Sequence, residues 1–304
     1  MNERHHRVLA IGECMVEMAP RGDGAYTRNF AGDTFNTAWY LRRLLPEAWS
    51  VDYCSAVGED RISDHMLAFM QQAGIGTNSV GRISGRTVGL YMIELDNGER
   101  SFSYWRGQSA AKLLARDRDV LSAALARTDV ALFSGITLAI LSEEDRRSLL
   151  EALAEARRRG TRVAFDPNMR LRLWPDVAVM CAAVAEAAEV ADIVLPSFDE
   201  DGQYYGETSP LETIARYRSA GASTIVVKNG VGRIHAEGRE EGVVTFDPQP
   251  AVAVVDTTAA GDSFNAGFLS ARLSGASLGD AIGRGAQVAA QVIGKRGALV
   301  EIDV

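Results

Sequence analysis

Short runs of β-branched residues alternate with amphipathic helical stretches along most of the chain, and this alternation constrains the fold more than any other feature. Strands joined through helices lie parallel, and a parallel sheet needs helices on both faces. The expected buried strands are Val8–Ile11, Val51–Val57, Val130–Phe133, Val163–Asp166, Ile193–Leu195, Thr224–Lys228 and Val252–Val255. The expected helices are Thr34–Leu45, Ser63–Ala73, Glu143–Arg159, Val177–Val190, Leu211–Ala220, Ala260–Leu273 and Leu278–Ile293. The pattern predicts an α/β fold with a central, mostly parallel sheet flanked by helices.

Residues 86–106 interrupt this alternation with two strand-like runs joined through Asn97-Gly98. Asn-Gly favours a two-residue hairpin turn because both of its positions need positive φ. A tight turn there places Tyr91 opposite Tyr104 and puts both tyrosines on one face with Arg106. Such a face suits either a surface hairpin with an aromatic pair or a lid whose tyrosines form walls and whose arginine binds an anion. The residues on the face favour the lid.

Charge and hydropathy exclude several classes of partner. The chain of 304 residues carries a net charge of −8, which argues against nucleic-acid binding. The N-terminal residues 1–13 are charged and lack the apolar core of a signal peptide. The most apolar long stretch, 177–195, is interrupted by acidic residues and is therefore no membrane span. We expect a cytoplasmic protein with no membrane or nucleic-acid partner.

The strongest local signal is VAVVDTTAAGDSFNAGF at 252–268. A β-branched run ends at Asp256, small residues follow, and a helical pattern begins near Ala260. The first amides of a helix lack intrahelical acceptors and carry the positive end of the dipole, so this turn can hold a phosphate. Asp262, in the first turn, either acts on a substrate hydroxyl beside that phosphate or only compensates the helix dipole.

The motif DTTAAGDSFNAGF resembles the signature D-T-x-G-A-G-D-x-F-x-x-G of ribokinase-like (PfkB) carbohydrate kinases, with Ala259 in place of its first glycine. Its TTAAGDSF variant is similar to that of the 2-keto-3-deoxygluconate kinases in this family. Further matching segments follow in the family's order: AIGECMVEM at 10–18, GDTFNTA at 32–38, YWR at 104–106, SGITLAILS at 134–142, FDPNMRLRLW at 165–174 and RGA at 296–298. The resemblance implies one ribokinase-like domain over residues 1–304, with a small β-strand lid from about 13–31 and 79–107.

The resemblance assigns the reacting groups to the turn before the last two helices. Asp262 matches the general base, which takes the proton from the hydroxyl that attacks the γ-phosphate of ATP. The amides of Ala259, Ala260, Gly261 and Asp262 match the anion hole that receives the developing negative charge.

The sugar-binding positions of the family match residues in three segments: Gly32, Asp33, Asn36, Tyr91, Tyr104, Arg106 and Arg170. Asp33 also suits a plain helix N-cap before Thr34, and both roles can coexist. Two arginines converging on a neutral sugar would be wasteful, because a guanidinium suits a carboxylate. The pair therefore favours an acidic sugar, whereas Arg172 is expected to be solvated or structural.

The ATP-contacting positions of the family match Asn168, Arg170, Ser197, Lys228, Asn229, Gly230, Gly232, Ala259 and Gly261. Lys228 either bridges phosphates or extends from the strand end into water. Ser197 stands where the family usually has asparagine. Glu200 matches the retained acid of that motif and is expected to hold Mg²⁺ through waters.

The expected activity is ATP-dependent phosphorylation of 2-keto-3-deoxygluconate at its terminal C6 hydroxyl. A fructokinase or another neutral-sugar kinase of the same fold is the main alternative. A non-catalytic sensor is disfavoured because the base and anion-hole positions are kept, and an NAD-dependent dehydrogenase because no GxGxxG follows the first strand. The resemblance also implies homo-oligomers assembled through lid strands.

Overall fold

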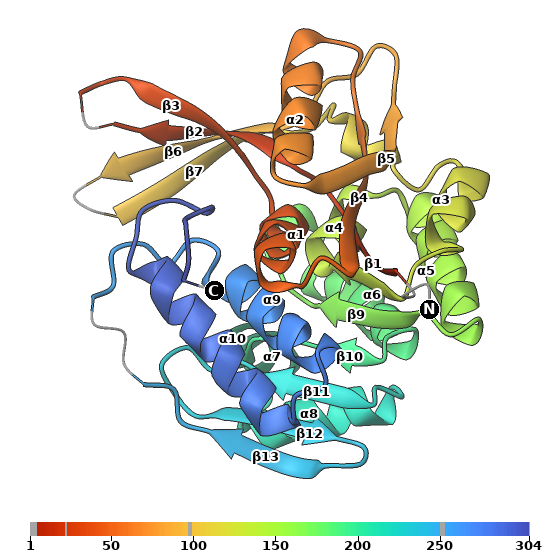
Figure 1. Cartoon of the computed structure of the whole chain (residues 1–304), viewed down its shortest axis with the longest axis vertical. Helices are drawn as coiled ribbons and strands as arrows, with labels where there is room; N and C mark the ends of the chain where they lie inside the picture. Colours follow the sequence, from red (N-terminus) through yellow and green to blue (C-terminus); the bar gives the residue numbers. More distant parts are fainter. Residues whose placement is uncertain (1–4, 22, 97–98, 250–252, 304) are drawn as a thin grey trace.

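A computed structural model describes residues 5–21, 23–96, 99–249 and 253–303, and its centre is a nine-stranded sheet (Figure 1). The strand order is β13-β12-β11-β10-β9-β8-β1-β4-β5, and only the β11–β12 and β12–β13 pairs are antiparallel. The strands are β1 (His6–Ile11), β4 (Trp49–Val57), β5 (Ile75–Arg82), β8 (Val130–Ser134), β9 (Arg162–Asp166), β10 (Ile193–Val194), β11 (Thr224–Val227), β12 (Ile234–Gly238) and β13 (Gly242–Phe246). The predicted α/β class with a mostly parallel sheet is confirmed.

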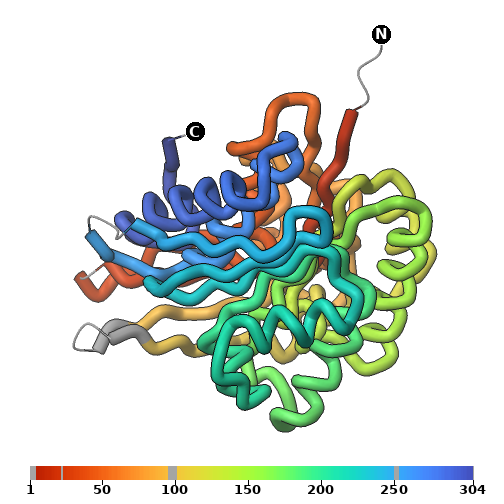
Figure 2. The backbone as a smooth tube through the Cα atoms, turned by 90° about the horizontal axis from the view of Figure 1, so that it is seen from below, coloured from red at the N-terminus to blue at the C-terminus, as the bar shows by residue number. Residues whose placement is uncertain are grey.

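Helices cover both faces of this sheet, as Figure 2 shows. Side chains alternate along each strand, so Val8 and Ala10 join the core beneath α1, α9 and α10, whereas Leu9 and Ile11 join the opposite core. The helices are α1 (Asp33–Leu44), α2 (Arg61–Gln72), α3 (Arg118–Leu125), α4 (Gly135–Ile140), α5 (Glu143–Arg158), α6 (Val177–Glu189), α7 (Phe198–Tyr205), α8 (Pro210–Ser219), α9 (Ala260–Leu273) and α10 (Leu278–Ile293), with 3₁₀ turns η1 (Ala110–Leu113) and η2 (Leu171–Leu173). In the part of the chain that is described, no helix has the length and apolar character needed to cross a membrane.

A second, four-stranded sheet projects from the body and is called the lid here (Figure 1). Its strands, in the order β3-β2-β6-β7, are β2 (Met15–Pro20), β3 (Tyr26–Ala31), β6 (Leu90–Asp96) and β7 (Glu99–Trp105). The predicted pairing of Tyr91 with Tyr104 is confirmed, while the predicted Asn97-Gly98 turn lies outside the described residues. Residues 79–82, which the expected lid included, lie in β5 and pair with β4 in the large sheet.

The expected strand at Val252–Val255 was wrong for residues 253–255, which form no strand; Val252 lies outside the described residues. Val254 and Val255 are 63% and 50% exposed. The amides of Val255 and Asp256 donate to the carbonyl of Ile293 at the end of α10. The β-branched residues 253–255 lie outside the sheet because the end of α10 supplies an acceptor for their backbone.

Candidate active site

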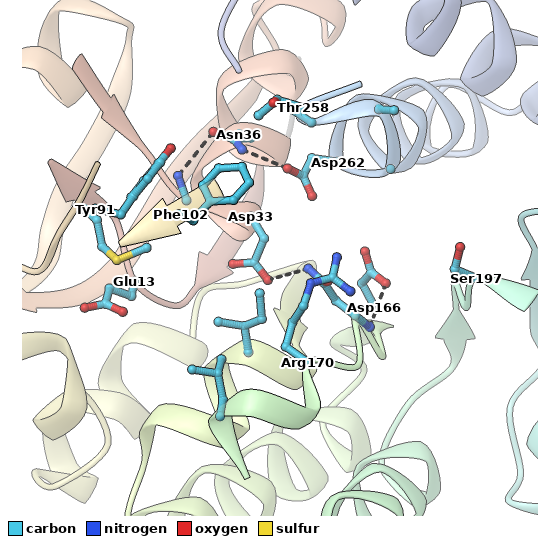
Figure 3. Close-up of a pocket in the computed structure, with 18 of the residues that line it drawn as sticks. Glu13, Asp33, Asn36, Tyr91, Phe102, Asp166, Arg170, Ser197, Thr258 and Asp262 are labelled. Atoms are coloured by element: carbon cyan, nitrogen blue, oxygen red, sulfur yellow. Dashed lines mark hydrogen bonds between the residues drawn. The ribbon is translucent and has the colours of Figure 1, made fainter. Parts of the chain in front are cut away.

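A cavity of about 320 Å³ opens between the lid and the carboxyl end of the large sheet (Figure 3). Ligands in open α/β sheets bind at this end of the strands. The structure brings to this pocket most of the residues proposed from sequence: Gly32, Asp33, Asn36, Tyr91, Tyr104, Arg106, Asn168, Arg170, Ser197, Glu200, Lys228, Ala259, Ala260, Gly261 and Asp262. Asn229, Gly230 and Gly232 lie in the turn after β11 and do not line this cavity.

The start of α9 is a tight turn that lines the pocket. Ala259 has a left-handed backbone, with φ of 61°, which turns the chain sharply into the helix. The amide of Ala260 donates back to the carbonyl of Thr257 at 3.2 Å. The amides of Ala259, Gly261 and Asp262 precede Ser263, whose amide donates to the Ala259 carbonyl at 2.9 Å as the first turn of α9 closes. Those donors and the positive helix end therefore remain available to an anion.

Asp262 faces the same space from the first turn of α9. Its Oδ2 accepts a hydrogen bond from Asn36 Nδ2 at 2.8 Å. Burial raises the pKa of Asp262 to about 8, and the negative charges of Asp33 and Asp166 add to the rise, while the Asn36 amide and Lys228 oppose it. A carboxylate with such a pKa binds a proton readily near neutral pH, as a general base must.

Three aspartates of the pocket are each held by an asparagine side chain, and each bond joins two different segments. The bonds run from Asn36 Nδ2 to Asp262 Oδ2 (2.8 Å), from Asn168 Nδ2 to Asp33 Oδ2 (3.1 Å) and from Asn265 Nδ2 to Asp166 Oδ2 (2.6 Å). The start of α1, the end of β9 with its following loop, and the start of α9 each supply one aspartate and one asparagine. The three bonds thus close a ring, called the Asp–Asn ring below, which fixes the three segments relative to one another.

Lys228 reaches this ring from the end of β11. Its Nζ lies 3.1 Å from Asn265 Oδ1 and 3.4 Å from Asp166 Oδ2, and its side chain is only 12% exposed. A Cβ atom at position 261 would lie 3.7 Å from the same Nζ. Lys228 therefore points into the pocket beside the start of α9, and not into water.

The lid wall of the pocket is aromatic, and its charged groups are paired. The rings of Tyr91 and Tyr104 stack with centroids 5.8 Å apart. The Tyr91 hydroxyl donates to the carboxylate of Glu17, which is buried in β2. Arg106 forms an ion pair with Glu13, whose side chain is 1% exposed.

Two buried atoms of the Arg106–Glu13 pair, Glu13 Oε1 and Arg106 Nε, have no hydrogen-bond partner. Buried polar atoms without partners are costly, so these two are placed to receive a ligand or water. A donor and an acceptor on a neutral pair suit a hydroxyl or a carbonyl group.

Glu200 lies at the opposite end of the pocket and fixes a loop. Its Oε2 accepts from the Met169 amide at 2.8 Å, and its Oε1 is paired with Arg170. Figure 3 shows the Arg170 side chain pointing into the pocket toward the space between Asp33 and Asp166. Within the described residues, no cluster of three acidic, histidine or cysteine side chains could hold a metal ion.

Sequence reasoning did not assign Glu13, Asp166 and Asn265 to this site, and it expected Arg172 to be solvated or structural. Glu13 and Asp166 each stand at or just after the end of a buried strand, and a charged residue there is a readable signal. Asn265 lies one turn after Asp262 on the same helix face, but nothing in a single sequence shows which acid it will meet. Arg172 stands two residues after Arg170, where its direction depends on the η2 turn.

A second, more apolar cavity of about 590 Å³ lies between α10 and the segment that follows β13. Ala286, Gln287 and Ala290 of α10 line one side, and Phe246 and Ala253 line the other. Its volume and apolar walls suit a planar aromatic group with a few polar edges.

The chain is similar to known proteins in sequence and in structure. The model of the family described as pfkB family carbohydrate kinase matches residues 5–303. The chain is 39% identical over 302 residues to a 2-dehydro-3-deoxygluconokinase of Dickeya dadantii, covering 97% of each chain. It is 26% identical over 264 residues to a fructokinase of Klebsiella pneumoniae, covering 86% of this chain and 83% of that protein. The structure of a PfkB protein from Polaromonas sp. JS666 aligns with a TM-score of 0.81 and 27% identity, covering 95% of each chain.

Proposed function

Since the chain belongs to the pfkB family of carbohydrate kinases, we propose that it transfers the γ-phosphoryl group of ATP to the C6 hydroxyl of 2-keto-3-deoxygluconate, also named 2-dehydro-3-deoxygluconate. The observation that carries this proposal is the buried Asp262 at the electropositive start of α9, inside a pocket whose far wall carries arginines. A relative of the same length at 39% identity bears the name of this activity.

In the proposed reaction the C6 oxygen attacks the γ-phosphorus, and the bond from that phosphorus to the ADP oxygen breaks. The proton of the hydroxyl passes to the Asp262 carboxylate, for which the raised pKa of this group is suited. The amides of Ala259, Gly261 and Asp262, at the start of α9, stabilise the charge that develops on the phosphoryl oxygens. Asn36 keeps the carboxylate directed at the hydroxyl.

The nucleotide is proposed to extend from this turn into the second cavity, where its base lies against α10. Lys228 contacts the phosphates beside Gly261. Further proposed contacts come from residues around the path: Asn168, Arg170, Ser197, Asn229, Gly230 and Gly232. Bound Mg²⁺ would neutralise phosphate charge, and Glu200 would hold it through waters, which fits a cation that keeps much of its hydration shell. Because both oxygens of Glu200 already accept hydrogen bonds, direct coordination is not proposed.

The sugar acid is proposed to lie between the lid and α1. Asp33 and Asn36 contact its hydroxyls beside Gly32, where a Cβ atom would lie 2.1 Å from the Glu13 carbonyl oxygen. Tyr91 and Tyr104 form its aromatic wall, and Arg106 and Arg170 contact its oxygens from either side. Stacked aromatic rings suit the apolar edge of a sugar chain.

A coupled assay of ADP release with Mg²⁺ tests the proposal on a panel of 2-keto-3-deoxygluconate, fructose and ribose. We expect kcat/KM for the sugar acid to exceed that for either neutral sugar by about 100-fold or more, the discrimination available to a site that pairs a substrate charge. Preference for fructose would overturn the substrate and support the neutral-sugar alternative. Absence of ATP-dependent turnover on every member of the panel would overturn the kinase mechanism.

We also propose a homo-oligomer that assembles through lid strands. Trp105 in the edge strand β7 is 59% exposed, and a sheet edge leaves backbone groups available for pairing with a second copy. Light scattering with size-exclusion chromatography should give a multiple of the chain mass, and Trp105→Lys should reduce it. A monomer at all concentrations would contradict this part of the proposal.

A further inference from the structure

Four cationic side chains line the pocket: Arg106, Arg170, Arg172 and Lys228. Whether any of them can bind a substrate carboxylate depends on the charge that each already faces. A cation next to a buried acid is neutralised locally, so it can donate hydrogen bonds but adds little net attraction for a second anion.

Three of the four cations have such partners. Arg106 is paired with Glu13, and Arg170 is paired with Glu200. Lys228 lies 3.4 Å from Asp166, deep in the Asp–Asn ring. Arg106 Nε and Glu13 Oε1 are buried without a partner, and this donor and acceptor suit a keto or hydroxyl group.

Arg172 differs from the other three. Within the described part of the chain it forms no ion pair, and its side chain reaches across from η2 to the lid. One of its terminal nitrogens donates to the Tyr104 hydroxyl, and its guanidinium lies over the Tyr104 ring, 4.3 Å from the centroid. A guanidinium has five N–H donors, so most of its donors remain available at the pocket edge.

We propose that Arg172 is the specificity-determining residue that binds the carboxylate of the sugar acid, while Arg106 with Glu13 binds its uncharged oxygens. This inference rests on the proposed function, since it needs an acidic substrate. It replaces the two earlier assignments, in which Arg106 bound the carboxylate and Arg172 was solvated or structural. The planar guanidinium of Arg172 suits a carboxylate, and its contact with Tyr104 links carboxylate binding to the lid.

The test compares 2-keto-3-deoxygluconate with 3-deoxyfructose, which carries a CH₂OH group in place of the carboxylate. Arg172→Gln should raise the KM for the acid about 10- to 100-fold, as expected for loss of a charge-assisted contact, with kcat nearly unchanged. The KM for the neutral analogue should change by less than about twofold, because that analogue offers no charge to lose. Arg172→Lys should keep part of the preference for the acid, since lysine keeps the positive charge but lacks the planar guanidinium.

Matched variants separate this role from a structural one. Arg147→Gln removes an exposed arginine of α5, paired with Glu143, and should change neither constant. Tyr104→Phe removes the hydroxyl contact of Arg172 and should raise the KM for the acid by less than Arg172→Gln does, because the guanidinium stays and only its position is freed. If the wild-type enzyme shows no preference for the acid, the proposed function fails together with the anchor. If the wild-type preference survives in Arg172→Gln but disappears in Arg106→Gln, the anchor alone is overturned and the carboxylate belongs to Arg106.

Discussion

The body wall and the lid wall of the pocket both hold charged side chains, but they compensate them differently. On the body wall, three aspartates are each held by a neutral asparagine amide, and within the described residues only Asp166 of the three has an ion pair, with Lys228 at 3.4 Å. On the lid wall, the buried Glu13 is paired with Arg106. An amide fixes a carboxylate in place without cancelling its charge, whereas an arginine cancels it.

This difference matches different tasks. Uncancelled negative charges raise each other's pKa, which prepares Asp262 to take a proton. Cancelled charges form a rigid polar surface that can discriminate ligands by hydrogen bonding. The body wall is thus suited to chemistry and the lid wall to recognition, and the following predictions test that division.

The largest effect is expected from Asp262→Asn, which keeps the shape of the body wall and removes the proposed base. We expect kcat to fall by about 10³-fold, within the usual range for loss of a general base, while the KM for ATP stays close to that of the wild type. Steady-state kinetics by ADP release measure both. Asp280→Asn, which changes a first-turn aspartate of α10 outside the pocket, serves as the control. Near-full turnover in the Asp262 variant would show that the body wall takes no part in the chemistry.

A smaller effect, with a pH signature, is expected from Asp33→Asn. In the wild type the base is ionised only above its pKa of about 8, so kcat/KM should climb as the pH rises through that value. Removing the negative charge of Asp33 lowers the pKa of Asp262, so the rise of kcat/KM with pH should move to lower pH. The activity itself should fall about 10²-fold, because the proposed contact with the sugar is lost. A rise of kcat/KM that stays at the same pH would show that the two carboxylates are not coupled.

On the lid wall, Glu13→Gln should affect stability more than chemistry. It leaves the Arg106 charge uncompensated beneath the lid, which should cost about 3 kcal/mol of unfolding free energy, measured by urea denaturation. Glu143→Gln removes the acid of an exposed pair with Arg147 and should cost less than about 1 kcal/mol. Equal losses in the two variants would contradict a buried, charge-cancelled lid wall.

The smallest effect is expected from Ala259→Gly in the turn that precedes α9 and lines the pocket. Alanine at a φ of 61° is strained, so glycine should stabilise the fold or leave it unchanged within about 1 kcal/mol. Glycine also loosens the turn that holds the anion-binding amides, so kcat should fall slightly, by about two- to fivefold. Thermal unfolding and kcat measured together test this, and a clear loss of stability would show that the left-handed turn is not strained.

The fold was predictable because its signals are local. Alternating strands and helices predicted the sheet class, and the expected turn at Asn97-Gly98 predicted the pairing of Tyr91 with Tyr104, which is confirmed. The motifs gave the positions of the proposed site residues, and the structure brings most of them to one pocket. The partners of the charges were not predictable, since Glu13 meets Arg106 and Asn265 meets Asp166 only through tertiary contacts. The same limit explains residues 253–255, whose β-branched composition gave no sign that α10 would supply the backbone acceptor.

The Asp–Asn ring has a consequence for the synthesis of the protein on the ribosome. The bond between Asn36 and Asp262 joins positions 226 residues apart, so its donor leaves the ribosome long before its acceptor is made. Every other segment of the ring precedes α9 in the chain, so the helix that carries Asp262 and Asn265 is made last. A nascent chain that ends before α9 therefore lacks Asp262, and the proposed phosphoryl transfer becomes possible only when synthesis is almost complete.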